Sequence, residues 1–177
     1  MEAQSQLQPT VAATAARYGL FTGIVNILYS FGLLATNQVG NAALGWISLL
    51  IIPVVGIVLA QRDFRVKNAG FMSYGEGVGI GALLSLLNGL LSSVFSYVYR
   101  EFIDPDVVRQ VTEQMRNKLE QAGTMSDAQI DQAIAMSQKF STGLIGFVIG
   151  LVSVTVVGTV LSLIISAFLK NAKPEFE

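Results

Sequence analysis

Four long apolar segments without Lys, Arg or Asp constrain this chain more than any other feature of its sequence. They cover residues 18–36, 42–60, roughly 77–99 and 142–169. A hydrocarbon core about 30 Å thick is crossed by about 20 helical residues that rise 1.5 Å each, so each segment is long enough to span it. The sequence therefore predicts an all-α membrane protein with four transmembrane helices.

The charged residues are separated from these segments. Only 13% of the 177 residues are charged, against about 25% in an average soluble domain. A charge at the centre of a bilayer costs about 2.5–3.5 kcal/mol or more, so a membrane requires this separation. We predict one membrane domain over residues 1–177, with a loose tail over 1–10. The spans are expected at about 17–36, 42–60, 71–99 and 141–169.

Composition excludes several classes of function. The net charge is −1, so the chain has no basic patch that could neutralise the phosphates of a nucleic acid. It contains no Cys and no His, which removes thiol nucleophiles, thiolate or imidazole zinc sites and His-based acid–base pairs. We therefore assign no catalytic, cofactor-binding or metal-binding residue, and we expect a protein that is not an enzyme.

Residues 105–140 are the only substantial region expected outside the membrane. Gly123 separates two helical patterns, and Ser126 with Gln129 has the spacing of a capping box that opens the second helix. One face of the first helix carries the apolar residues Val108, Val111, Met115 and Leu119. The sequence predicts an amphipathic helical hairpin here, between the third and fourth transmembrane helices.

Two prolines and a charged segment mark breaks in the helices. Pro53 lies in mid-span of the second helix, where it should produce a kink and free a carbonyl that a neighbour must satisfy. Residues 61–68 hold three cations and one anion and are expected to form the next loop. At the end of the third helix, Asp104 is expected to act as a cap and Pro105 to occupy the first position of a new helix.

The cations predict the orientation. Arg17, Arg62, Arg65, Lys67, Lys170 and Lys173 lie in short segments next to the ends of spans, where the positive-inside rule is strongest. The five cations on the other side are mostly remote from the spans and are diluted by seven carboxylates. We expect a protein of the bacterial inner membrane with both termini in the cytoplasm and the hairpin outside.

Small residues recur at every fourth position on the third and fourth helices. Such stripes let two helix backbones approach closely in lipid. Packing within one subunit is the simplest interpretation, and contact with a second copy or with another membrane protein is the alternative. The expected packing residues are Gly77, Gly81, Ser85 and Gly89 on the third helix, and Gly146, Gly150 and Gly158 on the fourth.

Three polar residues within the spans form a possible polar site. Glu76 is the only acid inside an apolar run; we expect it to anchor the helix edge through headgroups or through Arg62, Arg65 or Lys67, and a functional role is the alternative. Asn26 and Asn88 lie near mid-span, where hydrogen bonds between helices explain them without a substrate. Four helices with so few polar groups are expected to leave little room for a lumen.

Several short motifs resemble those of a family of uncharacterised bacterial membrane proteins, a domain of unknown function with four spans. The resemblance covers about residues 15–170. It is carried by Arg62-Asp63, the segment from Gly70 to Glu76, Tyr99, Ile103-Asp104-Pro105, and Met125-Ser126 followed by Gln129-Ile130. Gly77 departs from the larger residue expected after the Glu. The resemblance implies no activity, cofactor or catalytic residue.

Two functions remain open from the sequence. The first is a non-enzymatic scaffold or subunit of a membrane complex, in which the hairpin docks a partner. The second is a small carrier, or flippase-like protein, for lipid-linked or small amphipathic cargo. An enzyme would need a pair of carboxylates in one site, and Glu76 has no acidic companion at its depth. The expected partners are the lipid bilayer and another membrane protein or a second copy of the chain.

Overall fold

The computed structural model describes residues 9–173, so most of the tail expected over residues 1–10 lies outside the described residues. Seven α-helices and two π-helical segments follow one another along this part of the chain. They are α1 (Val11–Ala35), α2 (Ala42–Trp46), η1 (Ile47–Ile51), α3 (Ile52–Lys67), α4 (Tyr74–Val98), η2 (Tyr99–Ile103), α5 (Asp106–Ala122), α6 (Asp127–Ser141) and α7 (Gly143–Leu169).

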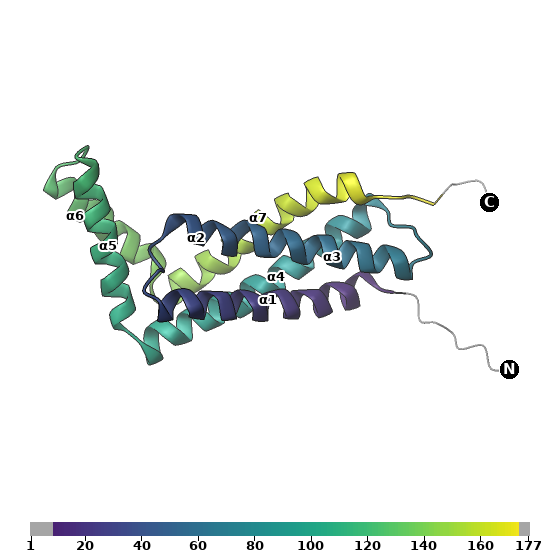
Figure 1. The fold of residues 1–177 in the computed structure, drawn as a ribbon, viewed down its shortest axis with the longest axis horizontal. Helices are drawn as coiled ribbons and strands as arrows, with labels where there is room; N and C mark the ends of the chain where they lie inside the picture. The colour runs from purple at the N-terminus through teal and green to yellow at the C-terminus, as the bar shows by residue number, and fades with distance from the viewer. Residues whose placement is uncertain (1–8, 174–177) are drawn as a thin grey trace.

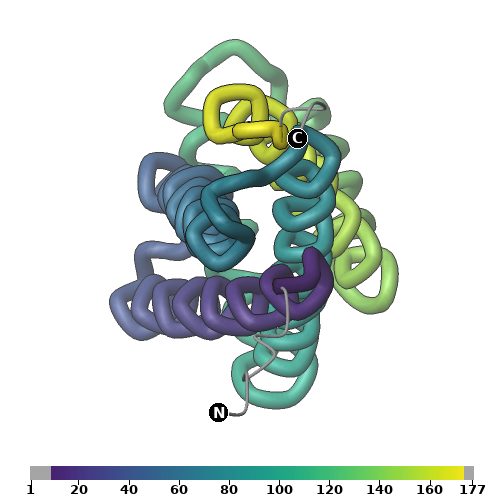
Figure 2. The backbone as a smooth tube through the Cα atoms, turned by 90° about the vertical axis from the view of Figure 1, so that its right-hand side faces the viewer, coloured from purple at the N-terminus to yellow at the C-terminus, as the bar shows by residue number. Residues whose placement is uncertain are grey.

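The helices form an elongated bundle with a cap at one end. Helices α1, α3, α4 and α7 run along the long axis, and α5 and α6 lie across one end (Figure 1). We call that end the hairpin end, and the opposite end, where α1 begins and α7 finishes, the terminal end. In the view along the axis from the terminal end, α1, α3, α4 and α7 lie around one another (Figure 2). The most extensive helix–helix interface joins α4 to α7.

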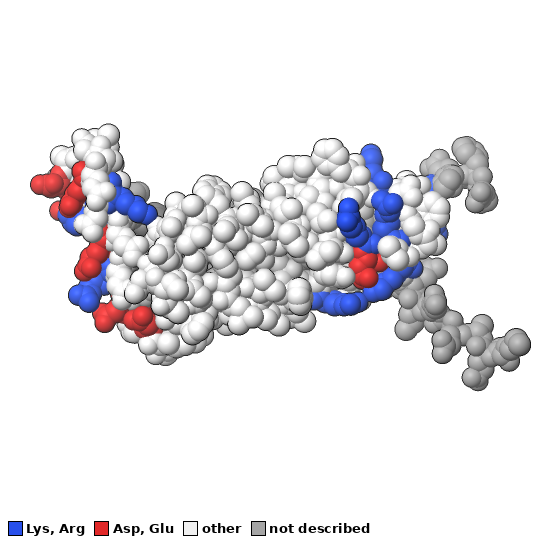
Figure 3. Space-filling view, viewed as in Figure 1, with Lys and Arg blue, Asp and Glu red and all other residues white. Residues whose placement is uncertain are grey.

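Four continuous helical stretches are long and apolar enough to cross a membrane, which confirms the predicted all-α membrane fold. They are Val11–Ala35, Ala42–Lys67, Tyr74–Ile103 and Gly143–Leu169. On the face shown in Figure 3, charged side chains gather at the two ends and the middle is uncharged. This distribution is the one that a hydrocarbon layer around the bundle requires.

The second span is longer than the sequence indicated, because the expected loop over residues 61–68 is mostly helix. α3 continues to Lys67, and the chain turns at Asn68, Ala69 and Gly70. Lys67 Nζ lies 2.7 Å from Asp63 Oδ2, one turn earlier. This i,i+4 pair, together with cations in the last turn, favours the helix over a loop.

Pro53 changes the helix in a specific way: a π-helical turn precedes it. In η1 the amide of Ile52 donates to the carbonyl of Ile47, five residues earlier. The next bond in this register would join residue 53 to Ser48, but proline has no N–H. Asn26 Nδ2 from α1 lies 3.4 Å from Ser48 O and serves as the substitute donor. The freed carbonyl is thus satisfied from a neighbouring helix, as a membrane interior demands.

The helical hairpin is present with the expected turn. Gly123 ends α5 with a left-handed φ of 62°, which glycine adopts without steric cost. Ser126 and Gln129 form a reciprocal capping box at the start of α6. The expectation for Asp104 was wrong in detail: its backbone carbonyl, and not its side chain, accepts from Val107 N at 3.3 Å, and Pro105 precedes the helix as its N-cap.

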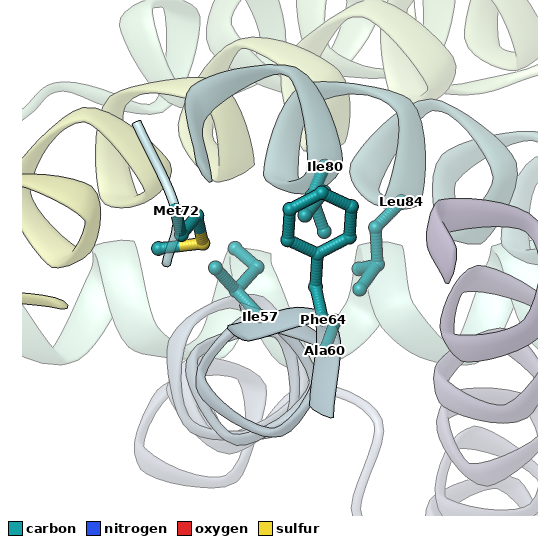
Figure 4. Packing of buried hydrophobic residues seen from close by; sticks show 6 residues of the cluster. All are labelled: Ile57, Ala60, Phe64, Met72, Ile80 and Leu84. Atoms are coloured by element: carbon teal, nitrogen blue, oxygen red, sulfur yellow. The ribbon is translucent and has the colours of Figure 1, made fainter. Parts of the chain in front are cut away.

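The buried apolar core lies toward the terminal end. Ile57, Ala60 and Phe64 of α3 pack against residues from the start of α4 and the turn before it (Figure 4). The members from the α4 side are Met72, Ile80 and Leu84. Met72 also exchanges two backbone hydrogen bonds of 2.8 Å with Asn171, which ties the turn before α4 to the segment after α7.

Candidate functional site

The small residues of α4 and α7 face each other in pairs. A Cβ added to Gly81 would lie 2.0 Å from Ser162 Oγ, and one added to Gly158 would lie 2.0 Å from Ser85 Oγ. Gly77 meets Ser166 and Gly150 meets Ser93 in the same antiparallel register, while Gly89 faces Leu151 and Val154. The two backbones therefore approach as closely as a missing side chain permits, and these glycines have a packing role.

Gly146 differs from the other expected packing residues. The three atoms nearest to a Cβ at this position belong to Ser141, at 2.5 to 3.2 Å. Gly146 thus lies at the sharp turn that joins α6 to α7, where an added Cβ would meet Ser141 before any residue of α4. The four-residue period continues through it in the sequence, so the pattern could not distinguish a helix–helix contact from a contact with the preceding turn.

A polar cluster reinforces the α4–α7 interface near the terminal end. Gln61 of α3 is fully buried, and its Nε2 donates to Gly77 O at 3.0 Å and to Ser166 Oγ at 2.9 Å. Ser162 Oγ also donates to Gly77 O, at 3.2 Å. Because Gln61 stands between an apolar run and a charged one, the sequence indicated a loop boundary. The structure shows a residue that joins three helices.

Glu76 has a local structural role. Its Oε2 accepts from Ser73 N at 2.7 Å and from Ser73 Oγ at 2.8 Å, and Ser73 Oγ accepts in turn from Glu76 N at 3.3 Å. This is a capping box at the start of α4. The expected ion pairs with Arg62, Arg65 or Lys67 are not found within residues 9–173; Asp63 is the carboxylate that pairs with Lys67 and Arg17 there.

Asn26 and Asn88 lie together in the middle of the bundle. Asn26 Nδ2 lies 3.4 Å from Asn88 Oδ1, and Ser48 Oγ donates to Asn26 Oδ1. Ser92 Oγ also donates to Asn88 Oδ1, at 3.4 Å. Asn88 is fully buried, and its Nδ2 has no hydrogen-bond partner among the described residues. This geometry fits the hydrogen bonds between helices that the sequence predicted, and the side-chain amide N–H groups of Asn88 remain without an acceptor among the described residues.

Two adjoining cavities open on the hairpin side of this cluster. The bundle cavity, of about 350 Å³, lies between α1, η1, α4 and α7, and Asn26 is among its lining residues. The hairpin cavity, of about 320 Å³, lies between the end of the bundle and the α5–α6 hairpin. We call the two together the vestibule. They share the lining residues Ser30, Ser48, Ser96, Arg100 and Ser141.

The vestibule is lined by both polar and apolar side chains. Serines from α1, η1 and α4 contribute hydroxyl groups, and the hairpin adds the polar residues Thr112, Ser137 and Gln138. The apolar hairpin residues that line the hairpin cavity are Val107, Val108, Val111, Met115 and Ile134. Val107 and Ile134 are buried as well. The apolar face that the sequence identified on the hairpin is therefore turned inward, over the cavity.

The sequence did not indicate the two cavities at the hairpin end. The serines Ser48, Ser92 and Ser96 could have indicated a polar cavity. However, serines at helical spacing are also typical of a packing stripe, and Ser93 does pack on Gly150. The cavities lie beside the two π-helical segments η1 and η2. Such segments are often found at functional sites, yet no residue pattern predicted either of them.

Arg100 is the cation that lines both cavities. Its Nη1 donates to Ser141 O at 2.7 Å, at the last residue of α6. The other cations of the hairpin end have different partners: Lys118 donates to Gly40 O, and Arg116 pairs with Asp131. The hydrogen bond that Arg116 donates to the Asp131 carboxylate raises the pKa of Arg116. Among the described residues, no group of His, Cys, Asp or Glu could hold a metal ion.

Comparison with known proteins identifies a family. The family model described as "Protein of unknown function (DUF4199)" matches residues 17–171, which confirms the resemblance to an uncharacterised family noted in the sequence. Neither a curated protein nor a solved structure matches the chain significantly. By this match over most of its length, the chain belongs to the DUF4199 family, and its fold is that of an all-α membrane protein.

Proposed function

We propose that the protein is a non-enzymatic carrier that binds a small amphipathic molecule in the vestibule. The observation that carries this proposal is the pair of adjoining cavities, of about 320 and 350 Å³, which are lined by several hydroxyl groups and by apolar side chains of the hairpin and the bundle. Small-molecule sites usually measure about 300–1,000 Å³ and combine an apolar lining with a few placed polar groups. An amphipathic cargo matches both surfaces.

The hairpin supports this proposal over a docking role. A helix pair that recruits a partner through its apolar stripe would present that stripe outward. Here Val108, Val111 and Met115 line the cavity instead. The hairpin has the buried apolar residues Val107, Ile130 and Ile134, and polar contacts also attach it to the bundle, since Arg100 and Lys118 donate to Ser141 O and Gly40 O. Such contacts suit a cover that opens for exchange of cargo.

A scaffold or subunit role is the second candidate. It is favoured by the outer surface of the hairpin, where exposed charges gather at the end of the bundle (Figure 3). These are Arg109, Glu113, Glu120, Asp127 and Asp131. Purification in mild detergent followed by mass spectrometry separates the two candidates. A stoichiometric protein partner supports the subunit role, and a copurified amphiphile supports the carrier.

We also propose that the protein lies in a bacterial inner membrane with its terminal end on the cytoplasmic side. Six of the eleven cations flank the spans at that end, and the positive-inside rule then gives the orientation. The chain has no Cys, so single cysteines report accessibility directly. Gln121→Cys should react with an impermeant maleimide in intact spheroplasts and Lys173→Cys should not; the reverse pattern contradicts the orientation.

Binding is tested by blocking the vestibule. Ser96 lines both cavities, so Ser96→Trp should fill the space where cargo lies. Val98 is two residues further along α4 and 40% exposed on its outer side, which makes Val98→Trp the matched control. In amphipol, wild type and Val98→Trp should bind dodecyl phosphate saturably and Ser96→Trp should not. The proposal fails if wild type binds no dodecyl amphiphile saturably, or if Ser96→Trp binds as wild type does.

A further inference from the structure

The vestibule is lined by the side chain of Arg100, and most N–H donors of this guanidinium have no hydrogen-bond acceptor among the described residues. Arg100 lies in η2, at the boundary between the two cavities, and is half-buried. It makes one hydrogen bond, from Nη1 to Ser141 O, and no ion pair with a carboxylate of residues 9–173. A guanidinium carries five N–H donors in a planar fork that fits carboxylate and phosphate oxygens. Most of this capacity is available to a ligand.

A structural role accounts for only part of this arrangement. Nη1 donates to the carbonyl at the end of α6, where a positive charge is favourable for the helix dipole. That contact uses a single donor. The half-buried side chain is also among the residues that line both cavities, together with Ser96 and Ser141. An arginine that only anchors a span extends its head outward to the lipid headgroups.

The other ionisable groups nearby do not cancel this charge. Glu101 lines the bundle cavity, but it is exposed, and no ion pair within 4 Å joins it to Arg100 among the described residues. Lys118 contributes to a separate surface pocket beside Gly40. Within the vestibule, Arg100 is the cation that faces both cavities.

Arg100 lies near the end of the third candidate span, Tyr74–Ile103. It lies 26 residues after Tyr74, which is about 39 Å along a helix that rises 1.5 Å per residue. A hydrocarbon core measures about 30 Å, and the headgroup regions bring the bilayer to about 40–45 Å. The apolar residues Leu33, Leu34 and Phe95 line the hairpin cavity from the bundle side. A headgroup at Arg100 would therefore leave its chain against apolar side chains.

We infer that the cargo is an anionic single-chain amphiphile, whose carboxylate or phosphate headgroup is bound by Arg100 while its chain lies beneath the α5–α6 hairpin. This inference rests on the proposed carrier function and adds the charge class of the cargo and the residue that recognises it. The hydrogen bond to Ser141 also places the bound headgroup at the contact between the hairpin and the bundle.

The test compares headgroups on one chain length, with the full protein in amphipol and amphiphiles below their micelle concentrations. Wild type should bind dodecyl phosphate at least tenfold more tightly than dodecyltrimethylammonium. Arg100→Gln should weaken binding of dodecyl phosphate by about 10- to 100-fold, as expected for a lost hydrogen bond between charged groups. Arg100→Lys should restore part of the affinity. Arg109→Gln, on the exposed side of α5, is the matched control and should bind as wild type does.

Each outcome has a distinct meaning. Equal affinity of wild type for the two headgroups, or unchanged binding by Arg100→Gln, overturns the inference and leaves the carrier proposal standing. Failure of wild type to bind either amphiphile overturns both. Inorganic phosphate at millimolar concentration should not displace dodecyl phosphate; if it does, the site recognises free phosphate rather than an amphiphile, and the inference is wrong. The headgroup comparison on wild type decides the matter even if Arg100→Gln does not fold.

Discussion

The terminal half and the hairpin half of the bundle are built on opposite principles. In the four long helices, the buried residues lie toward the terminal end. The buried residues farthest from that end are Asn26 on α1, Pro53 on α3, Ser93 on α4 and Gly158 on α7. Beyond these residues the same helices are half-buried or exposed and enclose the vestibule. One half is close-packed and the other is open.

This difference shows how one residue type serves two purposes in lipid. Helices in a membrane gain little from the hydrophobic effect, so small residues create stability by letting backbones approach. Ser162 and Ser166 do so opposite Gly81 and Gly77. Ser48 and Ser96 are equally small, but glycine does not face them, and the space beside them remains open. At these four serines, the presence of a glycine opposite distinguishes packing from cavity; Ser93 and Gly150 face each other and also line the bundle cavity, so they lie at the boundary.

The largest effect on stability is expected from bulk in the close-packed half. Gly81→Leu would place a side chain where Ser162 Oγ lies 2.0 Å from the added Cβ, so we expect a loss near the upper end of the usual 1–3 kcal/mol for overpacking. Gly32→Leu is the matched control: a Cβ there meets nothing within 4 Å, and no loss is expected. Thermal unfolding in detergent measures both. Equal losses would show that the two halves do not differ in packing.

A graded effect is expected along the same interface. A Cβ at Gly150 meets only Ser93 Oγ, at 3.1 Å, so Gly150→Leu should cost less than Gly81→Leu, about 1 kcal/mol. The position lies close to the level where burial ends. Thermal unfolding of both variants in the same detergent ranks them. A larger loss for Gly150→Leu would place the tightest contact in the hairpin half.

Removal of a buried amide should have an intermediate effect. Gln61→Ala deletes the donors to Gly77 O and Ser166 Oγ and leaves a space in the core. We expect a loss of about 1–2 kcal/mol, from the hydrogen bonds and the unfilled volume together. Ser92→Ala removes a weaker bond of 3.4 Å beside the bundle cavity, which Ser92 lines, and should cost less than about 0.5 kcal/mol. Chemical denaturation in mixed micelles compares the free energies of unfolding of the two variants. A larger loss for Ser92→Ala than for Gln61→Ala would contradict the proposed difference in packing between the two halves.

A small effect is expected at the start of α4. Glu76→Ala removes the acceptor for Ser73 N and should cost about 1 kcal/mol, as for a lost helix cap. Glu76→Gln should cost only a few tenths, because glutamine also closes a capping box, as Gln129 does at α6. The two variants are compared by thermal unfolding. A loss of cargo binding by a stable Glu76→Gln protein would instead indicate a functional carboxylate.

The regular features of this fold were predictable from the sequence, because they follow from local patterns. Uncharged runs located the spans, and Gly123 with the Ser126–Gln129 spacing located the hairpin. Asp63 is a residue for which the local pattern gave the wrong prediction. Its charge indicated a loop, but its side chain pairs with Lys67 one helical turn later and allows α3 to continue.

The vestibule was not predictable because it depends on register between helices. A π-helical turn at Ile47–Ile51 shifts the residues that precede Pro53 relative to those that follow, and it brings Ser48 to Asn26. Periodicity of 3.6 residues carries no information about such a shift. The burial of Gln61 was missed for a related reason: its partners Gly77 and Ser166 are distant in the chain and identified only by the fold.

The difference between a close-packed terminal half and an open hairpin half is tested most directly by the accessibility of two serine positions on α4. Ser85 is fully buried opposite Gly158, and Ser96, three turns further along α4, lines both cavities. In nanodiscs, Ser96→Cys should react with a small water-soluble thiol reagent and be protected by dodecyl phosphate, while Ser85→Cys should remain unreactive. Equal labelling of the two cysteines, or labelling of Ser96→Cys that dodecyl phosphate does not slow, would contradict a close-packed half joined to an open, cargo-binding one.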